Sequence, residues 1–120
     1  MKFNLVEHKV GLCKNRHRMV VESYIFPEIV SPMDITRLEQ TAISFIEKLY
    51  RGNIPEPLEY TRNSITLVTI TKYRGVLHLY ITGLTSAVLA VVNACILLNV
   101  KLVIWHYDKD TEDYVAQIMQ

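Results

Sequence analysis

Two short polar stretches contain residue types that can hold a phosphate group. The first is Asn15-Arg16-His17-Arg18. Arginine guanidinium groups form paired hydrogen bonds with phosphate oxygens, and histidine exchanges a proton close to neutral pH. Arg16 and Arg18 are therefore candidate ligand-binding residues, and His17 is a candidate catalytic residue. The alternative is that this stretch is a solvated turn between two strands.

The second stretch is Thr82-Gly83-Leu84-Thr85-Ser86, between a β-like run and an apolar helical run. Glycine lets a ligand approach the backbone closely, and the first N–H groups of a helix attract anions. All five residues are candidate ligand contacts. Alternatively, Gly83 only lets the chain turn, and Thr85 or Ser86 only caps the helix. The chain has no GxxxxGK[ST] or GxGxxG motif, which disfavours ATPases, GTPases and dinucleotide-dependent oxidoreductases.

Three further candidates lie at the end of the last long apolar run. They are His106 as an acid or base, and Tyr107 and Asp108 as ligand contacts. A helix over residues 85–98 joins this run to the strand over 76–82, so the two strands should be parallel. Their carboxyl ends then share one edge of the sheet, which is where ligands bind in open α/β folds.

The elements that position these residues follow from hydrophobic periodicity. The polar break after the first strand predicts an antiparallel hairpin, and Tyr73-Arg74-Gly75 predicts a second turn between paired strands. Residues 53–63 are expected to be a surface connection. The predicted fold class is α/β, a Rossmann-like mixed sheet with a C-terminal βαβ unit, an N-terminal β-hairpin and two helices, in one domain spanning residues 1–120. Strands are expected over residues 3–13, 19–26, 65–72, 76–82, 100–107 and 114–119, and helices over 32–51 and 85–98.

The first helix has a recognisable start and end. Ser31 is expected to cap it, with Pro32 at the first helical position and Asp34 near the positive helix end. Gly52 is expected to end it. The apolar residues between them recur at helical spacing, which is typical of a helix that lies on a sheet.

The overall composition excludes several classes of function. The chain has 120 residues, of which 50% are hydrophobic and 21% charged, and this predicts one folded domain. A net charge of +1 provides no overall basic field for duplex DNA. The spacing of Cys, His and acidic residues matches no zinc or calcium motif, so we expect neither a metal nor a cofactor.

Cysteine usage and hydropathy predict the compartment. Cys13 and Cys95 lie in apolar runs and are expected to be buried free thiols rather than disulfide partners, as in a reducing cytosol. No signal-peptide pattern opens the chain. The most apolar run, residues 87–100, is shorter than the roughly 20 residues that a membrane span needs. We expect a soluble cytoplasmic protein with no membrane partner.

The second predicted helix is unusual because only Ser86 and Asn93 interrupt its apolar surface. A helix that is apolar all round is buried on several sides. One side can face the sheet, and the other is expected to face the first helix or another subunit. The sequence therefore predicts a homodimer, since an exposed stripe of this size would otherwise cause aggregation.

The strand, the Thr82–Ser86 turn and the apolar helix together resemble the nucleotide-contacting turn of CARF domains and of small CRISPR-associated ring nucleases, which act in antiviral defence. The resemblance covers roughly the second half of the chain. It implies a dimeric Rossmann-like protein that binds cyclic oligoadenylates, with contacts at Thr82, Gly83, Thr85 and Ser86. The segment after the first strand differs, because here it leads into another strand rather than a helix.

The expected function is binding of a phosphate-bearing ligand, with a cyclic oligonucleotide second messenger as the leading candidate. If the protein is an enzyme, metal-independent phosphodiester cleavage is expected, with a ribose 2′-hydroxyl attacking the adjacent phosphate and His17 or His106 as acid or base. The alternative is a non-enzymatic interaction subunit or inhibitor that uses the apolar helix as a docking surface.

Overall fold

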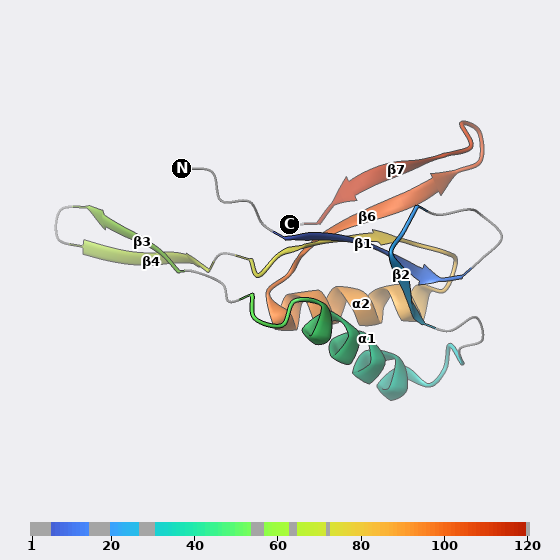
Figure 1. The fold of residues 1–120 in the computed structure, drawn as a ribbon, viewed down its shortest axis with the longest axis horizontal. Coiled ribbons are helices and arrows are strands. Elements are labelled where there is room, and N and C mark those ends of the chain that lie inside the picture. The colour runs from blue at the N-terminus through green and yellow to red at the C-terminus, as the bar shows by residue number, and fades with distance from the viewer. Residues whose placement is uncertain are drawn as a thin grey trace.

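The chain folds as a mixed β-sheet with helices on one face (Figure 1). This computed structural model describes residues 6–14, 20–26, 31–53, 57–62, 65–71 and 73–119. It confirms the predicted α/β class, with a βαβ unit in the second half of the chain. Within the described residues, no helix is long and apolar enough to cross a membrane.

Five described strands form the main sheet, in the order β2-β1-β5-β6-β7. The first four are mutually parallel, and β7 is antiparallel to β6 at the edge. The expected edge strand at the end of the chain is thereby confirmed. The strands are β1 (Glu7–Cys13), β2 (Ser23–Phe26), β5 (Val76–Tyr80), β6 (Lys101–Asp108) and β7 (Asp113–Ile118).

The helices α1 (Ile35–Leu49) and α2 (Thr85–Leu98) lie side by side on the same face of the sheet (Figure 1). The core lies between these helices and the sheet, as predicted. Alternate strand residues such as Leu77 and Leu79 point into it. On α2 the buried positions are mostly small, which allows close approach; they are Ala87, Ala90, Val91, Ala94 and Cys95.

The helix ends differ in part from the predictions. Asp34, not Ser31, is the N-cap of α1, and its carboxylate accepts a hydrogen bond from the Arg37 N–H at 3.3 Å. The expected cap at Ser31 is wrong because Ser31 precedes a turn, in which its carbonyl accepts from the Asp34 N–H. Asn99 ends α2 in the left-handed conformation, φ 57°, which asparagine tolerates.

Both cysteines are buried free thiols, as expected. Cys95 packs on the sheet side of α2, and burial raises the pKa of its thiol to about 12. Burial also raises the pKa of the Cys13 thiol. Neither sulfur is therefore a reactive thiolate at neutral pH.

The N-terminal strand pair is parallel, so the predicted antiparallel hairpin is wrong. Val10 pairs with Ser23 and Cys13 with Phe26, and the Glu22 N–H donates to the Lys9 carbonyl at 2.9 Å. Residues 14–22 separate the strands, whereas hairpin loops have about two to five residues. β2 begins opposite Val10, in the middle of β1, so the chain has returned part of the way along β1 before the second strand begins.

The third predicted strand has a different partner from the one expected. β4 (Ile65–Thr71) pairs antiparallel with β3 (Pro57–Arg62), not with β5. The segment read as a surface connection thus contains a strand, and Tyr73-Arg74-Gly75 is not a hairpin turn. Alternating hydrophobicity indicates a strand that is half-buried on a core. The β3–β4 pair, here named the arm, instead projects away from the sheet (Figure 1).

Candidate functional site

Four parallel strands end at one edge of the sheet, as the sequence predicts for β5 and β6. Going outward from β1, β2 lies on one side and β5 on the other. Such a reversal of strand order opens a crevice at the carboxyl ends of the two diverging strands, and ligands bind there in open α/β folds. In this chain the reversal of strand order lies between the ends of β1 and β5. Lys14 follows β1 and is exposed, and Thr82 and Gly83 follow β5.

The turn into α2 leaves the helix N-terminus without a side-chain cap. The N-cap is Leu84, which has no polar side chain, and the helix begins at Thr85. The alternative that Thr85 or Ser86 serves as the N-cap is therefore wrong. No acidic residue lies in the first turn. The positive end of the helix and its first N–H groups thus meet no compensating side-chain charge from the helix itself.

Gly83 is not required by the fold. Its φ lies outside the left-handed region in which glycine is favoured. A Cβ at this position would have no atom of the chain within 4 Å in the described structure. Neither backbone conformation nor packing explains a glycine here, and the residue is exposed. The fold therefore gives no reason for a residue without a side chain at this position.

The residues at the end of β6 are already engaged in local hydrogen bonds. His106 Nε2 bonds Gln117 Oε1 at 2.8 Å, which draws the ring toward β7 and away from β5. An Asp108 carboxylate oxygen accepts from the Asp110 N–H at 2.9 Å. The Tyr107 ring packs against Tyr114, with centroids 5.4 Å apart. The turn after Asp108, residues 109–112, is exposed.

The basic candidates Arg16, His17 and Arg18 lie outside the described residues. The described residue Lys14 leaves the sheet at the same edge as the turn into α2, because β1 and β5 are parallel.

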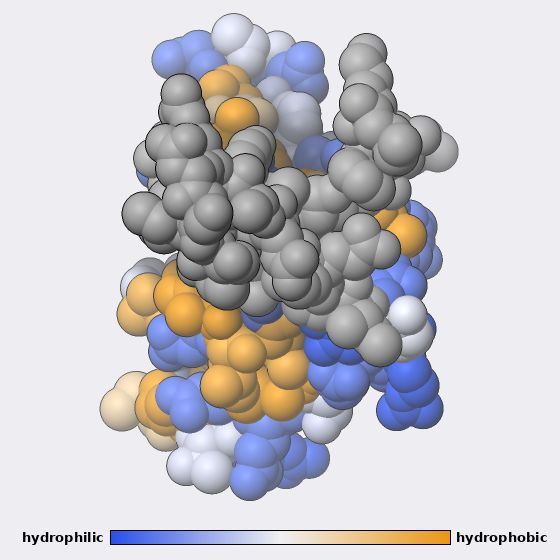
Figure 2. Space-filling view, turned by 90° about the vertical axis from the view of Figure 1, so that its left-hand side faces the viewer, coloured by the Kyte–Doolittle hydropathy of each residue, from blue (hydrophilic) through white to orange (hydrophobic). Residues whose placement is uncertain are grey.

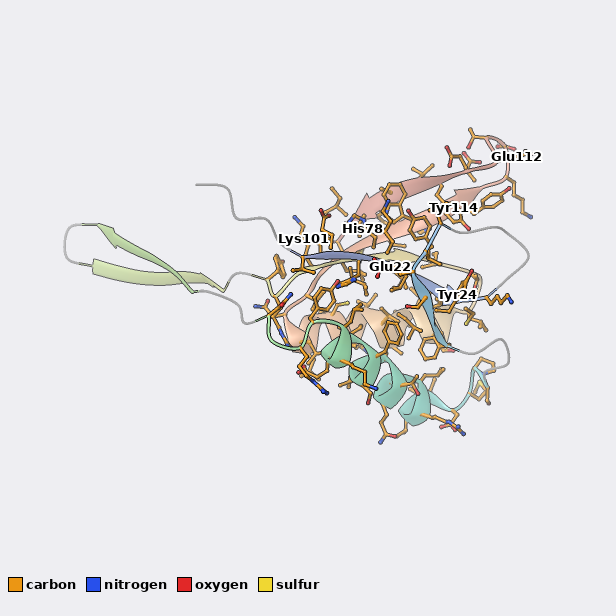
Figure 3. The ribbon with its side chains drawn as sticks, in the orientation of Figure 1. Glu22, Tyr24, His78, Lys101, Glu112 and Tyr114 are labelled. Carbon is orange, nitrogen blue, oxygen red and sulfur yellow. The ribbon has the colours of Figure 1, made fainter. Side chains whose placement is uncertain are left out.

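An aromatic cluster that was not predicted from the sequence lies on the sheet face opposite the helices. Tyr80 and Trp105, opposite each other on β5 and β6, stack with centroids 5.5 Å apart and ring planes 6° apart. Tyr114 on β7 meets Tyr80 edge-on at 5.0 Å. Figure 3 shows His78 and Tyr114 on this side of the sheet. The signal was present as alternation in β6, where Trp105 and Tyr107 share a face.

Burial within this cluster has an electrostatic consequence. It raises the pKa of the Tyr80 and Tyr114 hydroxyls. The Tyr114 hydroxyl is buried and has no hydrogen-bond partner in the described structure. An unsatisfied buried hydroxyl is uncommon in folded proteins. Because Tyr114 contacts both Tyr80 and Tyr107, the cluster extends from the middle of the sheet to the candidate edge.

The histidines inside the strands have partners, as expected. Trp105 Nε1 donates to His78 Nδ1 at 3.0 Å, and His78 Nε2 bonds Glu7 Oε1 at 2.8 Å. Because an indole N–H is only a donor, Nδ1 of His78 is the acceptor in the bond with Trp105. His8 Nδ1 bonds Glu22 Oε2 at 2.9 Å, and this bond holds the pKa of the Glu22 carboxyl below its ordinary value.

At the opposite edge of the sheet lies an apolar groove of about 250 Å³. It runs along the C-terminal end of α2 and the start of β6. The residues that line it include Tyr73, Val92, Ile96, Val100 and Met119. Among the described side chains, no three His, Cys, Asp or Glu residues are grouped so that they could hold a metal ion.

Comparison with protein-family models, with curated proteins and with solved structures finds no match for this chain.

Proposed function

We propose that this protein binds a phosphate-bearing ligand at the carboxyl edge of its parallel strands, with a cyclic oligonucleotide as the leading candidate. The main observation that supports the proposal is the glycine at position 83. It lies at the N-terminus of an uncapped helix, near the point where the strand order reverses between β1 and β5, and neither φ nor packing requires a glycine. A bare backbone at this position lets a phosphate approach the helix N–H groups.

The neighbouring side chains would complete the site. The Thr85 and Ser86 hydroxyls in the first turn of α2 would donate to phosphate oxygens. Lys14 would supply positive charge from the end of β1, with Arg16 and Arg18 following it in the chain. The Tyr107 ring, which packs on Tyr114, lies at the edge where the aromatic cluster ends, and a base would extend this cluster.

Cleavage of the ligand is a further proposal for the same site. A ribose 2′-oxygen would attack the adjacent phosphorus, its proton would pass to a base, and the bond to the 5′-oxygen would break with protonation of that oxygen. The products would be a 2′,3′-cyclic phosphate and a 5′-hydroxyl. His106 would have to exchange its bond with Gln117 for the ligand, which leaves His17 as the other candidate acid or base.

The test uses calorimetric titration of the pure protein with a series of cyclic oligoadenylates in the presence of EDTA. Chromatography of the same mixtures detects linear products. Gly83→Ala is the test variant, and Ser44→Ala, which removes an exposed hydroxyl on α1, is the matched control. We expect the parent and the control to bind equally, and Gly83→Ala to bind at least tenfold more weakly. Absence of binding by the parent would remove the proposal.

A second candidate function is that of a non-enzymatic interaction subunit. It is favoured by the uncovered apolar residues of α2, which include Leu89, Ile96 and Leu97. A protein that assembles through these residues but binds no cyclic nucleotide in the titration would support this second function over the first.

A further inference from the structure

The arm formed by β3 and β4 is not supported by the rest of the described chain. Its two strands pair with each other, whereas the other described strands belong to the main sheet. The radius of gyration is 16.2 Å, compared with about 14 Å for a compact chain of this length. An isolated two-stranded hairpin is at best marginally stable in water. The arm therefore needs a surface to pack on.

Hydrogen bonds of Arg74 hold the base of the arm against the main sheet and its helices, here named the body. The Arg74 guanidinium donates from Nε to the Asn53 carbonyl at 2.8 Å and from Nη2 to the Tyr50 carbonyl at 3.1 Å. It also pairs with the Glu47 carboxylate at 2.8 Å. Asn53 precedes the arm and Arg74 follows it, so these bonds join its two ends. The body thus presents the arm from a fixed base.

An apolar patch lies on α2, and its C-terminal part is at the end of the molecule from which the arm projects (Figure 1). Leu89, Ile96 and Leu97 have exposed fractions of 56%, 75% and 68%. They recur at helical spacing on the side of α2 away from its buried residues. Figure 2 shows apolar side chains gathered on this end. The apolar groove between Tyr73 and Met119 adjoins the patch through Ile96.

We propose that the arm of one copy of this chain packs on the α2 patch of a second copy, and the reverse, in a two-fold symmetric homodimer. In such an interface each copy contributes one arm and one patch. The two-fold symmetry would therefore bury both arms and both patches in a single interface. This inference concerns assembly and is independent of the ligand proposed above.

Reach and charge agree with this pairing. A seven-residue strand such as β4 extends about 23 Å, and the patch from Leu89 to Leu97 spans about 12 Å of helix. The arm is therefore long enough to cross the patch. Within the arm, β3 carries Glu59 and Arg62, whereas β4 has no charged residue, and α2 has none either. A contact made through β4 would therefore bury no unpaired charge on either element.

The first experiment compares the parent with three variants by sedimentation velocity at micromolar concentrations. One variant replaces residues 57–71 by a short Gly-Ser linker. The second carries Ile96→Glu and Leu97→Glu, which place charge on the patch at exposed positions. The control carries Gln40→Glu and Ser44→Glu on the exposed face of α1. We expect the parent and the control to be dimers and the first two variants to be monomers.

Mixing the arm variant with the patch variant distinguishes arm exchange from other dimers. The mixed pair retains one arm and the one intact patch it fits, so an equimolar mixture should form heterodimers with a Kd at least tenfold below that of either variant alone. A parent that is monomeric at high micromolar concentration overturns the proposal. So does an arm variant that dimerises like the parent, because the interface would then not need the arm.

A cross-linking experiment avoids dependence on the folding of the shortened chain. Because Cys13 and Cys95 are buried, Thr69→Cys on the arm can be paired with Leu97→Cys on the patch. Mild oxidation should give a disulfide-linked dimer of this double variant. The matched control, Ser44→Cys with Leu97→Cys, should give at least tenfold less. Equal yields from the two variants would overturn the proposal.

Discussion

The two ends of strand β5 each carry a glycine, and the two glycines have opposite surroundings. At the N-terminal end, Gly75 is buried, and a Cβ there would collide with the Tyr50 ring and lie 2.7 Å from the Val6 carbonyl oxygen. At the C-terminal end, Gly83 is exposed and the same Cβ would meet open space. One glycine is required by packing and the other is not.

The hydrogen bonds follow the same division. At the Gly75 end, Tyr50 Oη donates to the Val76 carbonyl at 2.6 Å, and the Arg74 N–H donates to the Asn99 carbonyl at 2.9 Å. These bonds join both helix ends to the start of β5. At the Gly83 end, α2 begins without a side-chain cap. The N-terminal end of β5 is therefore held by contacts that maintain the fold. At its C-terminal end, the first N–H groups of α2 have no side-chain cap.

The largest expected effect is that of Gly75→Ala. The new methyl cannot be accommodated by moving a flexible side chain alone, because one of its close neighbours is the Val6 backbone. Overpacking of this kind costs about 3 kcal/mol, and urea unfolding measures it. Gly83→Ala is the matched control. Equal stability of the two variants would remove the comparison between the ends.

Tyr50→Phe should have the next largest effect. It keeps the buried ring but removes the hydroxyl that satisfies the Val76 carbonyl. A buried acceptor left without a donor costs about 2 kcal/mol, again measured by urea unfolding. A loss smaller than about 0.5 kcal/mol would mean that water or another donor replaces the hydroxyl.

At the open end, Gly83→Ala, Thr85→Ala and Ser86→Ala should each change the free energy of unfolding by less than about 0.5 kcal/mol, as substitutions outside the buried core usually do. At least one of the three should bind a cyclic oligonucleotide tenfold more weakly, a loss of about 1.4 kcal/mol. Calorimetry measures the affinity. Parent-like binding by all three would make this turn structural after all.

The smallest effect is expected at the surface of the fixed end. The Arg74 guanidinium holds the pKa of the Glu47 carboxyl below its ordinary value of 4.5. A lowered folded-state pKa contributes stability above pH 4.5, and this contribution is lost as pH falls through the folded pKa. Glu47→Gln should therefore flatten the fall in stability at acidic pH. An unchanged profile would show that the exposed pair contributes nothing.

Local patterns were enough to predict the helices and the βαβ unit, because each depends on residues close together in the chain. The same is true of the end of α2 after Leu98. Pairing between distant segments was not predictable in this way. The direction of β2 and the partner of β4 depend on connection length and on contacts outside the strand itself, and both were mispredicted.

The candidate edge was predictable because a helical crossover makes strands parallel, which brings Thr82 and His106 to one edge. The register of β6 against β7 was not, and it is this register that places Gln117 within reach of His106. The role of Gly75 was missed for a similar reason. The ring that crowds it belongs to Tyr50, on another element.

The strand order also constrains how the chain can be made. β1 lies between β2 and β5, and Gly11 pairs with Tyr80, which the ribosome adds much later. Until then β1 can pair only with β2, and a two-stranded pair is marginal in water. The nascent N-terminal half therefore exposes Val10, Leu12 and Ile25, which are buried in the finished protein. We expect a chaperone to bind these apolar residues until β5 has been synthesised and pairs with β1.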